Sequence, residues 1–319
     1  MIALNSDGER IQSPPVLSIC IPTFNRAGYL QKTLQSIVAQ PGFAESCEIV
    51  ISDNHSTDAT GDVVAPFLSV YKNIRYYRNE TNIGADRNFL QLLSLGRGVY
   101  LKLNSDKTCF CEDRLPELVQ VLEKSHDGVV FVLNENDAGS ERGAFECGNF
   151  DEFLHRVSYW STWMDGIILR NEPYQALQDK GRAAGTNLIQ TEIMFRMLSQ
   201  GGASSIINKK MLCEQEVESK SGYNLFEVFV ANYLGLCRSL VVSGALSRKA
   251  YGREKINLLR KFIFPWYTKT LVMKDKRYRF DLSKAHGIIM KHYWNEPQLL
   301  LYPMVFLKNF FLDRSAKKR

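Results

Sequence analysis

Short apolar runs of strand character alternate with amphipathic helical segments four times before Asp106. The strand-like runs occupy residues 16–22, 47–52, 74–77 and 99–103, and the residues between them carry apolar side chains at helical spacing. Consecutive strands separated by helices need crossover connections, which favour a mostly parallel sheet with helices on its faces. The chain is therefore predicted to be an α/β protein.

Three of these strands end in a polar segment. The first runs into PTFNR at 22–26, the second into SDNHSTD at 52–58 and the fourth into NSD at 104–106. In open α/β sheets, ligands bind at the carboxyl ends of the strands. Asn104 and Asp106 offer an amide oxygen and a carboxylate two residues apart, which suits a hard cation that holds phosphate oxygens. A turn that merely ends a strand favours the same residue types.

The segment after the first strand, PTFNRAG, lacks the G-x-G-x-x-G fingerprint of dinucleotide-binding folds, so nicotinamide-cofactor chemistry is disfavoured. At 319 residues, with 45% hydrophobic and 23% charged, the chain is long enough for one large domain or for a domain with an appendage. Residues 134–149 are polar and contain glycine, and we expect an irregular loop over a site there.

The seven cysteines are odd in number and scattered, a pattern typical of reduced, mostly buried thiols in a cytosolic protein. Cys109 and Cys111 lack a second pair at ligand spacing, so a zinc site is disfavoured. The first residues lack a secretory signal, and no apolar run reaches the roughly 20 residues of a membrane span. These observations predict a cytoplasmic protein.

The net charge of +6 is unevenly distributed. Residues 247–319 contain 18 Lys and Arg against 5 Asp and Glu, a net of +13, which leaves −7 for residues 1–246. Such a basic segment faces an anionic membrane or nucleic acid, or is simply a solvated surface. Aromatic residues interleave with the basic ones, which favours the membrane, with residues 297–319 as the part that lies in its interface. A final helix packed on the core is the alternative.

Four motifs together resemble the nucleotide-binding half of inverting family 2 glycosyltransferases with the GT-A fold. They are PTFNR at 22–26, SDNHSTD at 52–58, NIGADRN at 82–88 and NSD at 104–106, in that order and spacing. The third motif is most similar to bacterial enzymes that build O-antigen or related surface glycans, including abequosyltransferase-like proteins. The resemblance implies a GT-A domain at 1–222, with a nucleotide-binding half at about 16–110 and an acceptor half at about 111–222, and leaves 223–319 as a basic, aromatic helical extension.

The resemblance also implies roles for single residues. Arg26 would lie near the diphosphate, Asp53 would accept a hydrogen bond from the base, and Asp106 would hold a divalent metal, Mn²⁺ or Mg²⁺. The residues implied to bind the nucleotide sugar are Pro22, Thr23, Asn25, Arg26, Asp53, Asn54, Gly84, Asp86, Arg87, Asn88, Asn104 and Ser105.

Two departures from the family pattern matter. The usual D-x-D is Asn104-Ser105-Asp106 here, so the metal affinity is expected to be lower, or Lys107 to replace part of the metal's charge. A carboxylate base must also remove the proton of the acceptor hydroxyl. Glu192 is the first candidate for this base and Asp165 the second. A surface ion pair of Glu192 with Arg196 is the structural alternative.

The expected activity is thus a metal-dependent transfer, with inversion, of a sugar from a nucleotide-diphosphate donor to a glycan acceptor. The acceptor is expected to be lipid-linked, and the enzyme to work on surface polysaccharide or lipopolysaccharide at the cytoplasmic face of the inner membrane. The alternatives are an inactive GT-A-like binding scaffold and a sugar-phosphate nucleotidyltransferase. Nucleic acid is not an expected partner. The sequence identifies neither the donor sugar, nor the acceptor, nor the oligomeric state.

Overall fold

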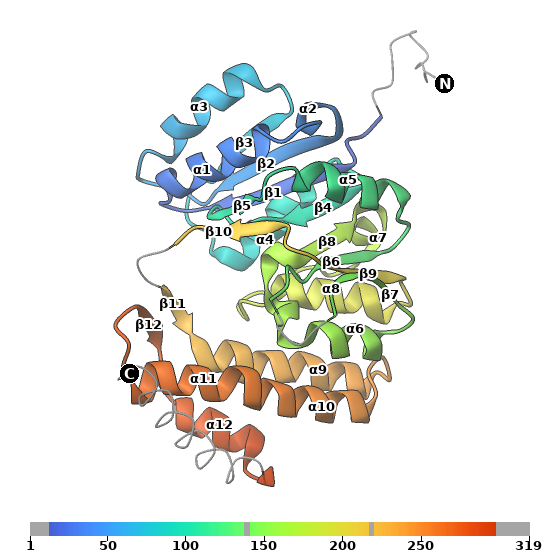
Figure 1. The fold of residues 1–319 in the computed structure, drawn as a ribbon. Coiled ribbons are helices and arrows are strands. Elements are labelled where there is room, and N and C mark those ends of the chain that lie inside the picture. Colours follow the sequence, from blue (N-terminus) through green and yellow to red (C-terminus); the bar gives the residue numbers. More distant parts are fainter. Residues whose placement is uncertain (1–12, 137–140, 217–219, 298–319) are drawn as a thin grey trace, which may run out of the picture. The chain divides into compact units, whose positions relative to one another are not determined.

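The computed structural model describes residues 13–136, 141–216 and 220–297 (Figure 1). The chain divides into two compact units. The first comprises Met1–Phe153 and Trp160–Glu216, and the second comprises Leu154–Tyr159 and Val217–Arg319. The domain boundary expected at 222/223 stays a prediction. Among the described residues, no helix is both long enough and apolar enough to cross a membrane.

The first unit is built on a sheet that has eight strands within the described residues. Their order across the sheet is β3-β2-β1-β4-β8-β6-β9-β7. The strands are β1 (Leu17–Thr23), β2 (Cys47–Asp53), β3 (Ile74–Arg78), β4 (Tyr100–Leu103), β6 (Val129–Val132), β7 (Gly143–Cys147), β8 (Ile167–Arg170) and β9 (Ser204–Asn208).

Most neighbouring strands of this sheet are parallel. β1 pairs in parallel with β2 and β4, while β8 is antiparallel to both β4 and β6. The predicted α/β class with a mostly parallel sheet is therefore confirmed. The expectation of an irregular loop at 134–149 is wrong for Gly143–Cys147, because these residues form edge strand β7, which pairs with β9.

Helices cover both faces of the sheet (Figure 1). One core lies between the odd-numbered residues of β1 and the apolar stripes of α1, α3 and α5. On the other face, α4 packs on β1 and β2, and α8 packs on β6 and β8. The helices of this region are α1 (Ala27–Val38), α2 (Phe43–Ser46), α3 (Thr60–Val70), α4 (Ala85–Leu95), α5 (Arg114–Lys124), α6 (Phe150–Val157), α7 (Asn171–Ala176) and α8 (Ile189–Ser199), with 3-10 turns at Ser158–Thr162 and Met164–Gly166.

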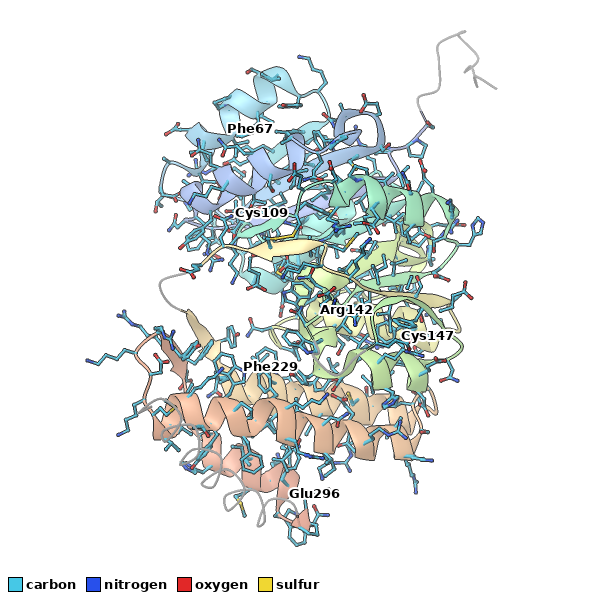
Figure 2. The ribbon with its side chains drawn as sticks, viewed as in Figure 1. Phe67, Cys109, Arg142, Cys147, Phe229 and Glu296 are labelled. Atoms are coloured by element: carbon cyan, nitrogen blue, oxygen red, sulfur yellow. A yellow bond between two sulfur atoms is a disulfide. The ribbon has the colours of Figure 1, made fainter. Side chains whose placement is uncertain are left out.

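A short antiparallel ribbon follows the NSD motif. It pairs β5 (Thr108–Phe110) with β10 (Leu212–Glu214), and a disulfide joins Cys111 to Cys213. The expectation that all cysteines are reduced is therefore wrong for this pair, because the ribbon places the two side chains together across 102 residues of sequence. Cys109, labelled in Figure 2, is a free, partly exposed thiol on the same ribbon.

The disulfide is expected to stabilise the first unit measurably. Replacing Cys213 with serine should lower the free energy of unfolding by about 2–4 kcal/mol, because the crosslink restricts the unfolded chain over a long loop. Urea unfolding of the wild type with and without a dithiol reductant, beside the variant, measures the effect. Cys147→Ser, which removes a thiol outside the disulfide, is the control. Equal stability of oxidised and reduced wild type would contradict the prediction.

The second unit is mainly helical. Its helical segments are η3 (Glu227–Asn232), α9 (Tyr233–Val242), α10 (Arg248–Leu258), η4 (Leu259–Ile263), α11 (Phe264–Tyr267), η5 (Thr268–Val272) and α12 (Ala285–Tyr293), of which η3, η4 and η5 are π-helical. The sequence indicated no clear strands here, yet β12 (Tyr278–Asp281) pairs in parallel with β11 (Lys220–Asn224). Phe229, labelled in Figure 2, packs on Phe262 with their ring centroids 4.6 Å apart.

A buried carboxyl group links α10 to its neighbours. Glu254 accepts hydrogen bonds from the hydroxyl groups of Ser158 (2.7 Å) and Tyr233 (2.9 Å). Burial raises the pKa of Glu254 to about 8. The group therefore carries a proton at neutral pH, which removes the cost of burying a charge.

Candidate functional site

The strand order reverses between β1 and β4, and ligands of open α/β sheets bind at such a switch point. Asp106, three residues after β4, meets the residues that end β1 there. Its Oδ2 accepts a hydrogen bond from the Thr23 hydroxyl (3.0 Å), and its Oδ1 accepts one from the Arg26 guanidinium (3.1 Å). The hydroxyl of Thr33 in α1 holds the backbone oxygen of Asp106 (2.9 Å).

Burial raises the pKa of Asp106, and the guanidinium of Arg26 and the hydroxyl of Thr23 oppose this rise. Arg26 itself is about half exposed, whereas the Asp106 side chain is almost fully buried. The switch point therefore holds a buried carboxylate that bonds to a half-exposed cationic side chain. Such a site attracts a ligand that brings both negative charge and a counter-cation.

The loops after β1 and β2 are tied together. Asn25, in a left-handed conformation with φ of 53°, donates its backbone N–H to the Ser56 hydroxyl (2.9 Å) and accepts a hydrogen bond from the Thr57 N–H (2.7 Å). The backbone N–H of Ala27 at the start of α1 donates to Asp58 (3.0 Å). Pro22 and Thr23 are the last two residues of β1, so these ties fix the position of the segment that leads to Arg26.

The last residue of β2, Asp53, is buried and already engaged by the protein. Its Oδ1 accepts from the Ser56 N–H (2.8 Å), and its Oδ2 accepts from the Tyr76 hydroxyl (2.6 Å). Burial raises the pKa of Tyr76, so this hydroxyl stays a donor. A nucleobase that donates a hydrogen bond to Asp53 Oδ2 has to share this oxygen with the Tyr76 hydroxyl or displace that hydroxyl. Neighbouring Asn54 instead accepts from the Ile83 N–H (2.9 Å) and so fixes the third motif.

In the third motif, NIGADRN at 82–88, some side chains bond within the protein and others are exposed. Gly84 precedes α4 with φ of +81°, a conformation that L side chains rarely adopt. Asn88 is buried and binds Ser52 through its amide oxygen (2.7 Å). Asp86 Oδ2 accepts from the backbone N–H groups of Gly185 (2.7 Å) and Asn187 (3.1 Å), just before α8. Arg87 is exposed.

Asn104 is fully buried and bonds within the protein through both ends of its amide. Its oxygen accepts from the Lys102 ammonium (3.0 Å), and its nitrogen donates to the backbone oxygens of Ser105 and Thr108 (both 2.9 Å). Lys102 also donates to the backbone oxygen of Asp165 (2.9 Å), whose carboxylate accepts from the Ser105 N–H. Burial lowers the pKa of Lys102 to about 8 and raises the pKa of Asp165.

Glu192, in the first turn of α8, lies between two arginines rather than at the surface. Its Oε1 pairs with the guanidinium of Arg182 (2.5 Å) and lies 3.5 Å from Nε of Arg196. The second oxygen, Oε2, is buried and has no hydrogen-bond partner among the residues that the structure describes. Glu192 thus keeps one buried carboxylate oxygen to which the described residues donate no hydrogen bond. Asp165 is fully buried beside Ser105, and both carboxylates stay candidates for the catalytic base.

A divalent metal is the cofactor that the resemblance implies, and the residues at the switch point fit it in one way. Among the described residues, no three His, Cys, Asp or Glu side chains gather into a metal-binding group. Magnesium in nucleotide sites takes one or two carboxylates and completes its shell with phosphate oxygens and water. The Asp106 oxygens each have a further lone pair besides their bonds to Thr23 and Arg26. The site therefore fits a cation shared with a diphosphate and does not fit one held by the protein alone.

The sequence reasoning missed several residues that shape the site. Thr33, Tyr76, Lys102 and Arg182 each hold a predicted site residue in place. Lys102 had a recognisable signal, since a lysine in a strand otherwise made of Tyr100, Leu101 and Leu103 needs a buried acceptor. The others had none, because their partners lie 10, 23 and 73 residues away and no local pattern connects them.

Comparison with known proteins gives a consistent result. Residues 18–155 match the family model described as Glycosyl transferase family 2. The chain is 28% identical over 286 residues to abequosyltransferase RfbV of Salmonella typhimurium, covering 81% of this chain and 84% of that protein. A shorter stretch of 53 residues is 47% identical to validoxylamine A glucosyltransferase of Streptomyces hygroscopicus subsp. jinggangensis, covering 17% of this chain and 13% of that protein.

Solved structures agree on the fold. The structure of S. aureus TarS 1-349 in complex with UDP superposes with a TM-score of 0.59 at 16% identity, covering 81% of this chain and 75% of that one. TarS 1-349 in complex with UDP-GlcNAc gives a TM-score of 0.55 at 17% identity, covering 70% and 66%. The predicted GT-A fold is thereby confirmed.

Proposed function

We propose that the protein moves a sugar from a nucleotide-diphosphate donor to a glycan acceptor with inversion, because residues 18–155 match the Glycosyl transferase family 2 model. The observation that carries the proposal is the position of Asp106. This buried carboxylate lies at the switch point of the sheet, between Thr23 and Arg26. Relatives and structural neighbours of this chain include an abequosyltransferase and a protein solved with UDP-GlcNAc, which supports a nucleotide sugar as the donor.

The geometry supports a division of labour at the diphosphate. Arg26 presents its guanidinium at the open side of Asp106, where it can meet the negative charge of the leaving group. Mn²⁺ or Mg²⁺ on Asp106 would supply further positive charge to the same phosphate oxygens. Asn25 and Asp53 lie at the ends of β1 and β2, where they line the nucleoside side of the site. Asn104 has a structural role in this arrangement, because its amide oxygen accepts a hydrogen bond from Lys102.

Glu192 is the proposed base for the acceptor hydroxyl. Its free Oε2 can accept the proton, while Arg182 holds Oε1 and thereby fixes the orientation of the carboxylate. Asp165 suits a positioning role better, because its Oδ1 is committed to the backbone of Ser105. An attack on the face of the sugar opposite the diphosphate inverts the anomeric centre.

The proposal extends to the setting of the reaction. The similarity to an abequosyltransferase supports a role in O-antigen or related surface-polysaccharide synthesis, with a lipid-linked glycan as the acceptor. The charge of +13 over residues 247–319 supports a peripheral position on the anionic cytoplasmic face of the inner membrane. Residues 298–319, which include most of the expected interfacial segment, lie outside the described residues.

Calorimetric titration of UDP, GDP, CDP and dTDP, each with Mn²⁺, with Mg²⁺ and with a chelator, tests the proposal. We expect one of them to bind, and to bind at least about tenfold more weakly with the chelator, because Asp106 and the cation share the diphosphate. Equal binding with the chelator would contradict the metal dependence. If none of the four binds under any condition, the proposed donor site is wrong and the scaffold alternative gains support.

A further inference from the structure

A cluster of positive charge lies in the second unit, on the segment from Lys269 to Arg279. This segment, here called the basic loop, comprises most of η5, the turn after it and the first two residues of β12. It contains five cationic side chains and one carboxylate, a net of +4. The cationic residues are Lys269, Lys274, Lys276, Arg277 and Arg279, all of them exposed. Asp275 pairs with Arg277 (2.6 Å), so four cations face solvent without this local partner.

The tip of the basic loop is apolar. Val272 and Met273 are adjacent in sequence, and their exposed fractions are 56% and 58%. Two consecutive exposed apolar side chains are unusual on a surface that otherwise carries charge. Their exposure to water is unfavourable in free energy, and burial in an apolar phase removes that cost. The tip therefore has the composition of a segment that lies against an apolar phase.

The tip stands on a fixed base. The backbone N–H of Met273 donates to Thr268 (2.7 Å), and that of Asp275 donates to Lys269 (3.0 Å). Beneath it, the Trp266 ring packs against Tyr278, with the centroids 5.0 Å apart, and β12 pairs with β11. The exposure of the tip is thus part of the folded arrangement of this loop.

A cavity of about 350 Å³ opens beside the tip. It is lined by Thr270, Lys274, Asp275, Lys276, Tyr278 and Arg279. Three of these side chains are cationic, and the single carboxylate already has Arg277 as its partner. Lysine and arginine side chains around an open cavity suit a phosphate group.

We propose that the basic loop docks the protein on an anionic phospholipid bilayer, with lipid phosphates in the cavity and Val272 and Met273 at the boundary between headgroups and acyl chains. A bilayer matches both properties of the loop, because it offers negative charge at its surface and an apolar phase just below it. Nucleic acid or free phosphate matches the charge and leaves the apolar tip in water. The inference rests on the proposed function for its biological sense, since it names the surface that presents a lipid-linked acceptor.

Vesicle co-sedimentation of the full chain tests the proposal. We expect binding to vesicles of phosphatidylglycerol and phosphatidylcholine, and none to phosphatidylcholine alone. The variant Lys274→Gln/Lys276→Gln/Arg279→Gln should partition at least about 100-fold more weakly, because each cation near the surface contributes to the attraction. The control Arg248→Gln/Lys249→Gln/Arg253→Gln removes the same charge from exposed positions of α10 and should retain most of the binding.

Insertion of the tip has its own readout. In the variant Met273→Trp, the emission of the added tryptophan is obtained by subtracting the wild-type spectrum. This emission should shift to the blue on anionic vesicles, and brominated acyl chains should quench it. Equal losses in both triple variants, or full binding by the basic-loop variant, would overturn the proposal. So would titrations in which inorganic phosphate binds the loop while the vesicles do not. None of these assays contains a nucleotide, so their failure leaves the nucleoside diphosphate titrations unaffected, and the reverse also holds.

Discussion

Replacing Asp106 with asparagine should lower the rate of sugar transfer by at least about 100-fold while the fold stays intact, since groups that stabilise a developing negative charge are typically worth that much. Asparagine has nearly the same shape, yet it loses the charge that pairs with Arg26 and would hold a cation. The site would then lack both its metal ligand and the anchor of its guanidinium. Transfer from the nucleotide sugar identified by titration, measured with saturating metal, gives the effect.

Asp62→Asn is a matched control, because it makes the same chemical change at an exposed position in the first turn of α3. It should retain full activity. Circular dichroism and thermal unfolding of the Asp106 variant should resemble those of the wild type. If the Asp106→Asn protein transferred sugar at an unchanged rate, Asp106 would have no role in the transfer, whatever the metal affinity of the variant.

Replacing Lys102 with methionine should lower the free energy of unfolding by roughly 3–5 kcal/mol, because it leaves a buried carboxylate without the cation near it and buried polar groups without their donor. Methionine fills a similar volume. It cannot donate to Asn104 or to the backbone oxygen of Asp165, and it leaves the buried Asp165 carboxylate without its nearby cation. Urea unfolding followed by tryptophan fluorescence measures the loss.

Two further variants separate the buried interaction from a general effect of losing a lysine. Lys124→Met, at an exposed position in the last turn of α5, should change the stability by less than about 0.5 kcal/mol. Lys102→Met/Asp165→Asn should be more stable than the sum of the single changes predicts, since the second substitution removes the uncompensated charge. Strict additivity of the two single changes would show that the charges do not interact.

The sequence predicted the four strands of the first 106 residues closely, because each is a short apolar run and three of them end in a polar segment. The predicted strands at 47–52 and 74–77 lie within β2 (Cys47–Asp53) and β3 (Ile74–Arg78). Edge strand β7 and strand β12 were missed for a shared reason. Both are short and carry polar or charged residues, and they are fixed by pairing with β9 and β11 rather than by their own composition.

Single positions of the site were harder to predict. Asn104 resembles a metal ligand in sequence, but its amide bonds to Lys102 and to the backbone of Ser105 and Thr108. The pairing of Cys111 with Cys213 depends on a ribbon formed across 102 residues, which cysteine spacing does not reveal. Tertiary neighbours decide both cases, and a sequence pattern contains only local neighbours.

The carboxylate of Asp86 links the two halves of the first unit, and this link affects how they respond to a ligand. It belongs to the NIGADRN motif, and it holds the amides of Gly185 and Asn187, which lie 99 and 101 residues further along the chain. These two residues belong to the loop that leads into α8. Arg182 of the same loop donates a hydrogen bond to the Glu192 carboxylate. We expect a nucleotide that shifts the start of α4 also to shift the loop that orients Glu192. We therefore expect the proposed donor and acceptor to bind in a preferred order.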